Sequence, residues 1–248
     1  MSTFAEEKAR GLDEAYRKAA QDVIADLQNV LAEPELDIRP VELERFEKVD
    51  RAWFGRATET LKSLGFRHLR DMDASALGPK GAPPMCVRVL LSEDGSTSAA
   101  LYQVIPRSPG LLLKAILWMM RKWQTPRIVE LISYGKDGRV VSTSNQGDVN
   151  QFSSPPNSSR RQLPLTASIE EVHAAHQVHL SETNLAPRRF VDFDQLNAAR
   201  EAQRAHQNAW RLEVGLMPEE LDRLLAPHGA NGERIRPYIE KGLAERRS

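Results

Sequence analysis

The sequence predicts an α+β protein with a small antiparallel sheet of about four strands, flanked by N-terminal helices and a helical C-terminal region. Three observations indicate this fold class. Apolar residues recur at helical spacing up to residue 64, two strand–turn–strand patterns follow, and helical spacing returns after residue 168. The chain has 248 residues, of which 41% are hydrophobic, so it can bury a core.

The N-terminal part predicts two helices. Apolar residues recur every three or four positions over residues 4–33, and again from Phe46 to Leu64. Gly65 follows directly, and glycine is the usual residue at the left-handed position that ends a helix. We therefore expect the second helix to stop at Gly65.

Two hairpins are predicted to form the sheet. Residues 85–92 and 97–105 have strand character and flank Asp94-Gly95, a dipeptide that favours tight hairpin turns. Residues 127–134 and 139–145 repeat this arrangement. The stretch that follows, residues 150–164, is rich in Ser, Pro and Asn and is predicted to be a loop.

Helices are predicted again in the C-terminal part. Ser168 is a good N-cap, and two glutamates follow it in the first turn, where the helix dipole favours negative charge. Further helices are expected over residues 194–214, 218–226 and 233–246. The predicted organisation is a helical segment over residues 1–80, an α+β core over residues 81–182 and a helical extension over residues 183–248.

Charge, cysteine content and hydropathy exclude several classes of protein. The formal net charge is zero, which argues against a general nucleic-acid-binding protein. Cys86 is the single cysteine, so no internal disulfide forms, and we expect it to be a small buried residue of a strand. The chain opens with charged residues rather than a secretion signal, and no run approaches the roughly 18 apolar residues of a spanning helix. These features predict a cytoplasmic protein.

Signatures of catalysis are missing from the sequence. The chain contains no phosphate-binding glycine loop, no dinucleotide-binding fingerprint and no Gly-x-Ser-x-Gly motif. One cysteine cannot form a zinc ribbon or a thiol redox pair. We therefore predict no cofactor and favour a non-catalytic protein.

One segment resembles a metal-binding pattern. Glu170 and His173 form a Glu-x-x-His step, and His176 and His179 continue at three-residue spacing on a predicted helix. Three-residue steps spread the imidazoles over an arc of about 120°, so neighbouring pairs can chelate an ion but all three cannot without strain. Glu170, His173 and His176 are the candidate ligands of a metal-dependent enzyme, and polar residues on a partly exposed helix are the alternative.

A second candidate is a small-molecule pocket at the sheet. Hydroxyl and amide side chains gather at a predicted strand end, residues 142–148, where they can donate and accept hydrogen bonds. Such a cluster is also common on the solvent face of an edge strand. The residues that we expect to line the pocket are Arg88, Tyr102, Ser142 and Asn145.

The most unusual stretch is PGLLLKAILWMMRKWQTP, residues 109–126. A helical wheel at about 100° per residue places Lys114, Arg121 and Lys122 on one narrow face and a broad apolar side opposite. No Asp or Glu occurs from Gly95 to Val129, and five Lys and Arg residues give this stretch a charge of +5. The pattern predicts a basic amphipathic helix that is too short to span a membrane.

Three locations are open for this predicted helix. It can pack on the sheet as part of the core, dock on a protein partner, or lie on an anionic membrane surface; an additional strand is a fourth reading. We predict a cytoplasmic interaction or regulatory protein that docks on a partner or on the inner face of the membrane, with a homo-oligomer left open. The expected docking residues are Leu112, Lys114, Ile116, Trp118, Met120, Arg121, Lys122 and Trp123.

Overall fold

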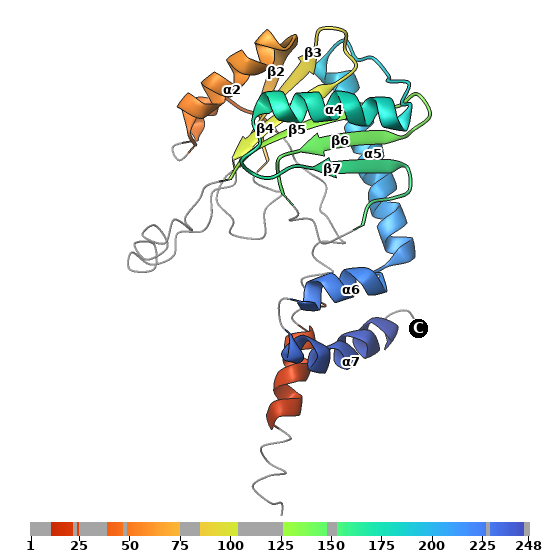
Figure 1. Ribbon diagram of the computed structural model, residues 1–248. Coiled ribbons are helices and arrows are strands. Elements are labelled where there is room, and N and C mark those ends of the chain that lie inside the picture. The colour runs from red at the N-terminus through yellow and green to blue at the C-terminus, as the bar shows by residue number, and fades with distance from the viewer. Residues whose placement is uncertain are drawn as a thin grey trace, which may run out of the picture. The chain divides into compact units, whose positions relative to one another are not determined.

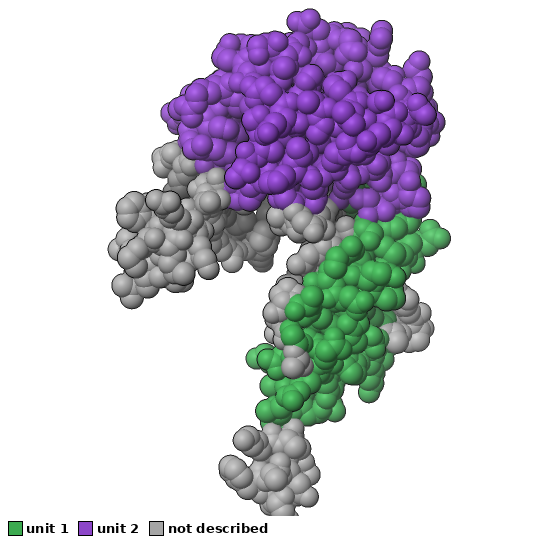
Figure 2. Space-filling view, viewed as in Figure 1, with its two compact units in different colours: residues 1–33, 151–153, 206–248 green, residues 34–150, 154–205 purple. Residues whose placement is uncertain are grey.

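The structure is a computed structural model of the 248-residue chain. It describes residues 11–21, 24, 39–46, 49–74, 85–103, 126–147, 153–226 and 229–245. The chain divides into two compact units, which Figure 2 shows in different colours. Unit 1 comprises residues 1–33, 151–153 and 206–248, and unit 2 comprises residues 34–150 and 154–205. The helix over residues 51–63 belongs to the same unit as the sheet. The predicted organisation into residues 1–80, 81–182 and 183–248 stays a prediction.

Unit 2 contains one mixed sheet, whose strand order follows the order along the chain (Figure 1). Neighbouring strands are antiparallel, except that the last two are parallel. The strands are β1 (Arg39–Pro40), β2 (Phe66–Asp73), β3 (Cys86–Ser92), β4 (Ser98–Gln103), β5 (Arg127–Tyr134), β6 (Val140–Ser144) and β7 (Ser158–Gln162). The α+β class is confirmed, and both predicted hairpins are present as β3–β4 and β5–β6.

The sheet is larger than the four strands predicted, because β1, β2 and β7 were not expected. In β2 a bulge between His68 and Arg70 interrupts the pairing with β3. The bulge shifts the alternation of side chains, so Phe66 packs on one face and Met72 on the other. Strand β7 lies in the predicted loop and has the sequence SSRRQ, which carries no apolar residue. Neither strand shows the period-two hydrophobic pattern on which strand prediction depends.

The helices agree more closely with the predictions. They are η1 (Leu43–Arg45, a 3-10 helix), α2 (Arg51–Ser63), α4 (Ile169–Thr183), α5 (Phe193–Val214), α6 (Pro218–Leu225) and α7 (Ala230–Glu245), and residues 11–21 are also helical. Helix α2 begins later than predicted, because Asp50 caps it by accepting a hydrogen bond from the Trp53 amide. Gly65 follows the helix with a φ of 81°, as expected for its left-handed position.

Helices α2 and α4 cover the first face of the sheet (Figure 1). Phe54 and Leu61 of α2 are fully buried there, together with Leu90, Leu101 and Leu131 of three neighbouring strands. Helix α4 starts with a capping box in which Ser168 and Glu171 bond to each other's backbone amides, so the predicted N-cap is confirmed.

The second face of the sheet is packed by the first part of α5. Phe193 and Leu196 contact an apolar cluster that includes Met72, Leu91 and Tyr134. The segment before the helix is tied to the sheet by hydrogen bonds, of which Phe190 N to Gly95 O is one, at 2.9 Å.

Unit 1 has its own small core around Leu221 and Ile239 of α6 and α7. A buried ion pair joins Arg211 to Glu220, at 2.8 Å. Burial raises the pKa of Glu220, but hydrogen bonds from two backbone amides and from Arg211 outweigh it and hold the pKa below its usual range.

Two further observations concern the cysteine and the hydropathy of the helices. Cys86 begins β3 and is fully buried, as predicted, and burial raises the pKa of its thiol to about 12. Among the helices that the structure describes, none combines the length and the hydropathy that a membrane-spanning segment requires.

Candidate functional site

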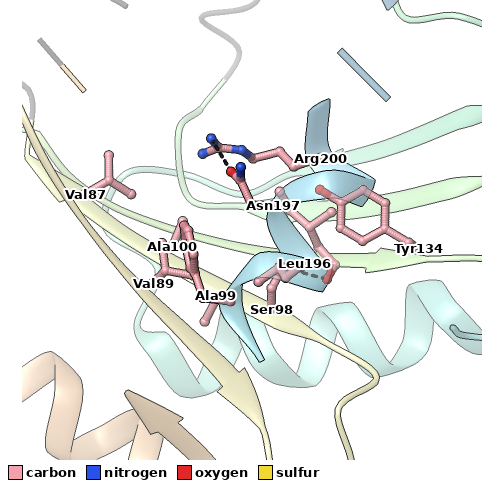
Figure 3. Close-up of a pocket in the computed structure, with 11 residues that line it drawn as sticks. Val87, Val89, Ser98, Ala99, Ala100, Tyr134, Leu196, Asn197 and Arg200 are labelled. Carbon is pink, nitrogen blue, oxygen red and sulfur yellow. Dashed lines mark hydrogen bonds between the residues drawn. The ribbon is translucent and has the colours of Figure 1, made fainter. Parts of the chain in front are cut away.

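A pocket of about 60 Å³ lies on the second face of the sheet, beneath α5 (Figure 3). Its walls come from β3, β4 and β5 on one side and from the first part of α5 on the other. The lining is mainly apolar and consists of Val87, Val89, Ser98, Ala99, Ala100, Ile132, Tyr134, Phe193, Leu196, Asn197 and Arg200. Apolar walls with a few polar groups are the usual composition of a small-molecule site.

The polar groups of this pocket converge from α5 and β5. Arg200 donates one hydrogen bond to Asn197, at 2.8 Å, and the Asn197 amide in turn donates to Glu201. Tyr134 is 7% exposed, and its ring packs edge-on against Phe190. Figure 3 shows the tyrosine hydroxyl turned toward α5, where Asn197 and Arg200 lie.

Electrostatics distinguish this pocket from an ordinary gap in a core. Burial lowers the pKa of Arg200, and the charge of Arg204 adds to this effect, whereas Tyr134 and the carboxylate of Glu201 act in the opposite direction. Burial also raises the pKa of Tyr134. Arg200 is half-buried, so its charge is only partly solvated, a condition that a negatively charged ligand relieves.

The residues predicted to bind a metal lie in different surroundings. Glu170 is exposed, and the His173 ring packs edge-on against Phe66. His176 is fully buried and His179 nearly so, and both face the sheet. Within the described residues, no group of three or more His, Cys, Asp or Glu side chains is placed to hold a metal ion.

His176 and His179 instead belong to a buried chain of hydrogen bonds. His176 Nε2 lies 3.1 Å from Ser133 Oγ, and its Nδ1 lies 3.1 Å from Thr143 Oγ1. The same threonine oxygen lies 3.2 Å from His179 Nδ1, and His179 Nε2 lies 2.8 Å from Ser159 Oγ. Thr97 extends the chain through Ser133, at 2.9 Å.

This hydroxyl–histidine chain, from Thr97 to Ser159, couples the two imidazoles. The Thr143 hydroxyl has one proton, so it donates to one Nδ1 and accepts from the other. His176 and His179 must therefore carry their protons on opposite ring nitrogens. With both imidazole rings neutral, every side chain in this hydroxyl–histidine chain has a hydrogen-bond partner. These hydrogen bonds hold α4 against the sheet.

Acidification is expected to weaken the fold through His176. Burial lowers its pKa from 6.5 to about 3, and the charges of neighbouring histidines contribute. As the pH falls below about 6.5, the unfolded chain takes up a proton that the native state excludes, so the free energy of unfolding decreases. Chemical denaturation should show a loss of about 2 kcal/mol from this residue between pH 7 and pH 5.

The matched variants for this experiment are His176→Gln and His173→Gln on the same helix. The first should flatten the pH dependence by that amount, and the second controls for replacing a half-buried histidine of α4 by glutamine. If the free energy of unfolding depended on pH equally in wild type and His176→Gln, His176 would not be the cause of the loss of stability in acid.

The four residues predicted to line a ligand pocket do not converge. The strand register places Arg88 and Asn145 on the face covered by α2 and α4, and Tyr102 and Ser142 on the opposite face. Tyr102 and Ser142 thus share a face with the observed pocket, but they are not among its lining residues.

Arg88 and Asn145 have internal partners. Arg88 makes a two-pronged ion pair with Asp71, with both distances 2.7 Å. Asn145 accepts a hydrogen bond from the Val129 amide and donates to the carbonyl of Arg127, so its side chain continues the β5–β6 pairing past the strand end. Both residues support the fold.

The eight predicted docking residues, from Leu112 to Trp123, lie outside the described residues. The structure does describe the strands on both sides of them. Gln103 at the end of β4 is the direct antiparallel partner of Arg127 at the start of β5. The two ends of the intervening segment, residues 104–126, are therefore neighbours in the sheet.

Several site residues were not expected from the sequence. Arg200 and Tyr134 line the pocket, and the hydroxyls of Ser133, Thr143 and Ser159 hold the histidines. Nothing in the spacing of Arg200 along the helix distinguishes it from a solvated arginine, so the sequence carried no signal for the pocket. Comparison of the chain with known protein families, with curated proteins and with solved structures found no match.

Proposed function

We propose that this is a non-catalytic docking protein that binds an anionic membrane surface through the Leu111–Trp123 segment. The observation that carries the proposal is the pairing of Gln103 with Arg127. A turn of about two to five residues closes such a hairpin, yet residues 104–126 separate these two strands. Long insertions between paired strands are commonly functional, and loops carry much of the binding by proteins.

The base of this insertion is anchored by contacts that do not involve the insertion. Gln103 Oε1 accepts a hydrogen bond from the Asp50 amide, at 2.7 Å. Arg127 forms an ion pair with the carboxylate of the same Asp50, which is the N-cap of α2. Substitutions within the insertion should therefore leave the base of the hairpin in place.

Composition favours an anionic lipid surface over a protein groove. The stretch from Gly95 to Val129 carries five positive charges and no negative ones. Each Lys or Arg near an anionic membrane contributes about 1 kcal/mol of attraction. Trp118 and Trp123 add the residue type that prefers the boundary between lipid and water.

Sedimentation with lipid vesicles tests the proposal. The wild-type chain should sediment with vesicles that contain phosphatidylglycerol and should remain in solution with phosphatidylcholine alone, and added salt should weaken binding. The triple variant Leu112→Ser/Ile116→Ser/Met120→Ser should bind at least about tenfold more weakly, because each apolar residue contributes roughly 1.5 kcal/mol or more when buried.

A matched control replaces three exposed apolar residues elsewhere. Val178→Ser/Val191→Ser/Leu212→Ser changes side chains that are 51%, 71% and 72% exposed, and this variant should bind like wild type. If the wild-type chain sedimented with neither kind of vesicle, binding to an anionic membrane would be excluded. An acidic protein partner would then be the remaining candidate for this segment. Unfolding of the first triple variant would make the segment part of the core and would overturn the proposal.

A further inference from the structure

The pocket beneath α5 combines a small volume with an arginine that forms no ion pair with a described residue, although the charge of Glu201 acts on it. Within the described residues, the Arg200 guanidinium donates one hydrogen bond, to Asn197, and forms no ion pair. A guanidinium has five N–H donors in a fixed plane, so most of its donors are left to solvent or to a ligand. The lining residues include no Asp or Glu.

Tyr134 supplies a second polar group to the same pocket. The residue is 7% exposed, and its hydroxyl makes no hydrogen bond to a described residue. Every buried side-chain oxygen or nitrogen of the described residues has a partner, so this hydroxyl is one that solvent reaches. The hydroxyl is turned toward the helix that carries Arg200 (Figure 3), and both residues line the pocket.

The remaining walls are hydrocarbon. Val89, Ala100 and Ile132 form the sheet side, and Phe193 and Leu196 form the helix side. A volume of about 60 Å³ accommodates only a few non-hydrogen atoms, since one water needs roughly 10–15 Å³ of such space. The pocket therefore suits a ligand that has one anionic end and a short apolar end.

We propose that this pocket binds a short aliphatic monocarboxylate. The planar guanidinium of Arg200 pairs with the carboxylate, the arrangement for which arginine is best suited. The Tyr134 hydroxyl donates a further hydrogen bond to the same group, and Asn197 holds the guanidinium in position. The alkyl chain lies against Val89, Ile132 and Leu196. This site is separate from the proposed docking segment and goes beyond the docking function.

Titration of the full chain with sodium butyrate, followed by calorimetry or ligand-observed NMR, tests this site. Butyrate should bind saturably to wild type, at least about tenfold more weakly to Arg200→Gln, and more weakly to Tyr134→Phe. Arg56→Gln provides the matched control, because Arg56 is an exposed residue of α2 and does not line the pocket. It should bind butyrate like wild type.

Two further probes separate the parts of the proposal. Butylamine carries the wrong charge and should not bind, and inorganic phosphate has no apolar end and should bind more weakly than butyrate. Equal binding of butyrate by wild type and Arg200→Gln, or no binding at all, would overturn the site. Phosphate that binds as tightly as butyrate would overturn the role of the apolar walls. If Arg200→Gln fails to fold, Tyr134→Phe, which removes one oxygen, tests the site instead. Binding of butyrate by Tyr134→Phe as tight as by wild type would then overturn the proposal.

Discussion

Replacing Arg88 with alanine is expected to lower the free energy of unfolding by about 3 to 5 kcal/mol, the largest effect that we predict for a single side chain. The guanidinium bonds to both carboxylate oxygens of Asp71, and it also donates to Thr58, at 3.1 Å. Asp71 is 8% exposed. Removing Arg88 leaves a buried carboxylate with only His68 beside it, and an unpaired buried charge is costly.

Urea denaturation of Arg88→Ala and of the matched variant Arg56→Ala measures this effect. Arg56 is an exposed residue of α2, so its removal should cost less than about 0.5 kcal/mol. The double variant Asp71→Leu/Arg88→Met should recover part of the loss, because it removes both charges together. If Arg88→Ala were no less stable than Arg56→Ala, the buried ion pair would not stabilise the sheet.

The same pair determines part of the response to acid. Burial raises the pKa of Asp71, but hydrogen bonds from Arg88 and His68 outweigh it and bring the pKa down to about 2. The stabilisation is therefore complete above about pH 4 and is lost as the pH falls toward 2. In Arg88→Ala this part of the pH dependence should shrink, which distinguishes loss of the ion pair from loss of packing.

Replacing Thr143 with valine is expected to cost about 2 to 4 kcal/mol, although the two side chains have nearly the same shape. Its hydroxyl lies between His176 Nδ1 and His179 Nδ1, at 3.1 and 3.2 Å. Thr143 is fully buried, so water cannot replace the lost oxygen. Each imidazole would then have a nitrogen without a partner, and a buried unsatisfied group costs roughly 1 to 3 kcal/mol.

Thr183→Val on α4 is the control for this prediction. The Thr183 hydroxyl donates only to carbonyls of its own helix, so its loss should cost less than about 1 kcal/mol. Thermal unfolding of both variants measures the difference. Similar melting temperatures for Thr143→Val and Thr183→Val would show that the hydroxyl–histidine chain contributes little.

The parts of the fold that could be predicted carry local signals. Gly65, Asp94-Gly95 and Ser168 each act through the geometry of a few neighbouring residues, and each marks an element boundary in the structure. Strands β2 and β7 lack such signals. Their positions depend on pairing with β3 and β6, respectively. Such pairing involves residues distant in sequence, so the residues of β2 and β7 alone do not indicate it.

The candidate site was harder to predict because its residues come from distant parts of the chain. The spacing of His173, His176 and His179 indicates a helix but not which imidazole is buried. That depends on Ser133 and Thr143, whose hydroxyls make burial of histidine favourable. Arg200 resembles a solvated helix residue in sequence, and only the packing of α5 on the sheet places it in a pocket.

The fluorescence of two tryptophans tests the docking proposal most directly. The variant Trp53→Phe/Trp210→Phe retains only Trp118 and Trp123 of the four tryptophans in the chain. With vesicles that contain phosphatidylglycerol, their emission should shift to shorter wavelength and become protected from a water-soluble quencher, whereas phosphatidylcholine vesicles should have little effect. Emission and quenching that stay unchanged as anionic vesicles are added would contradict binding of this segment to a membrane surface.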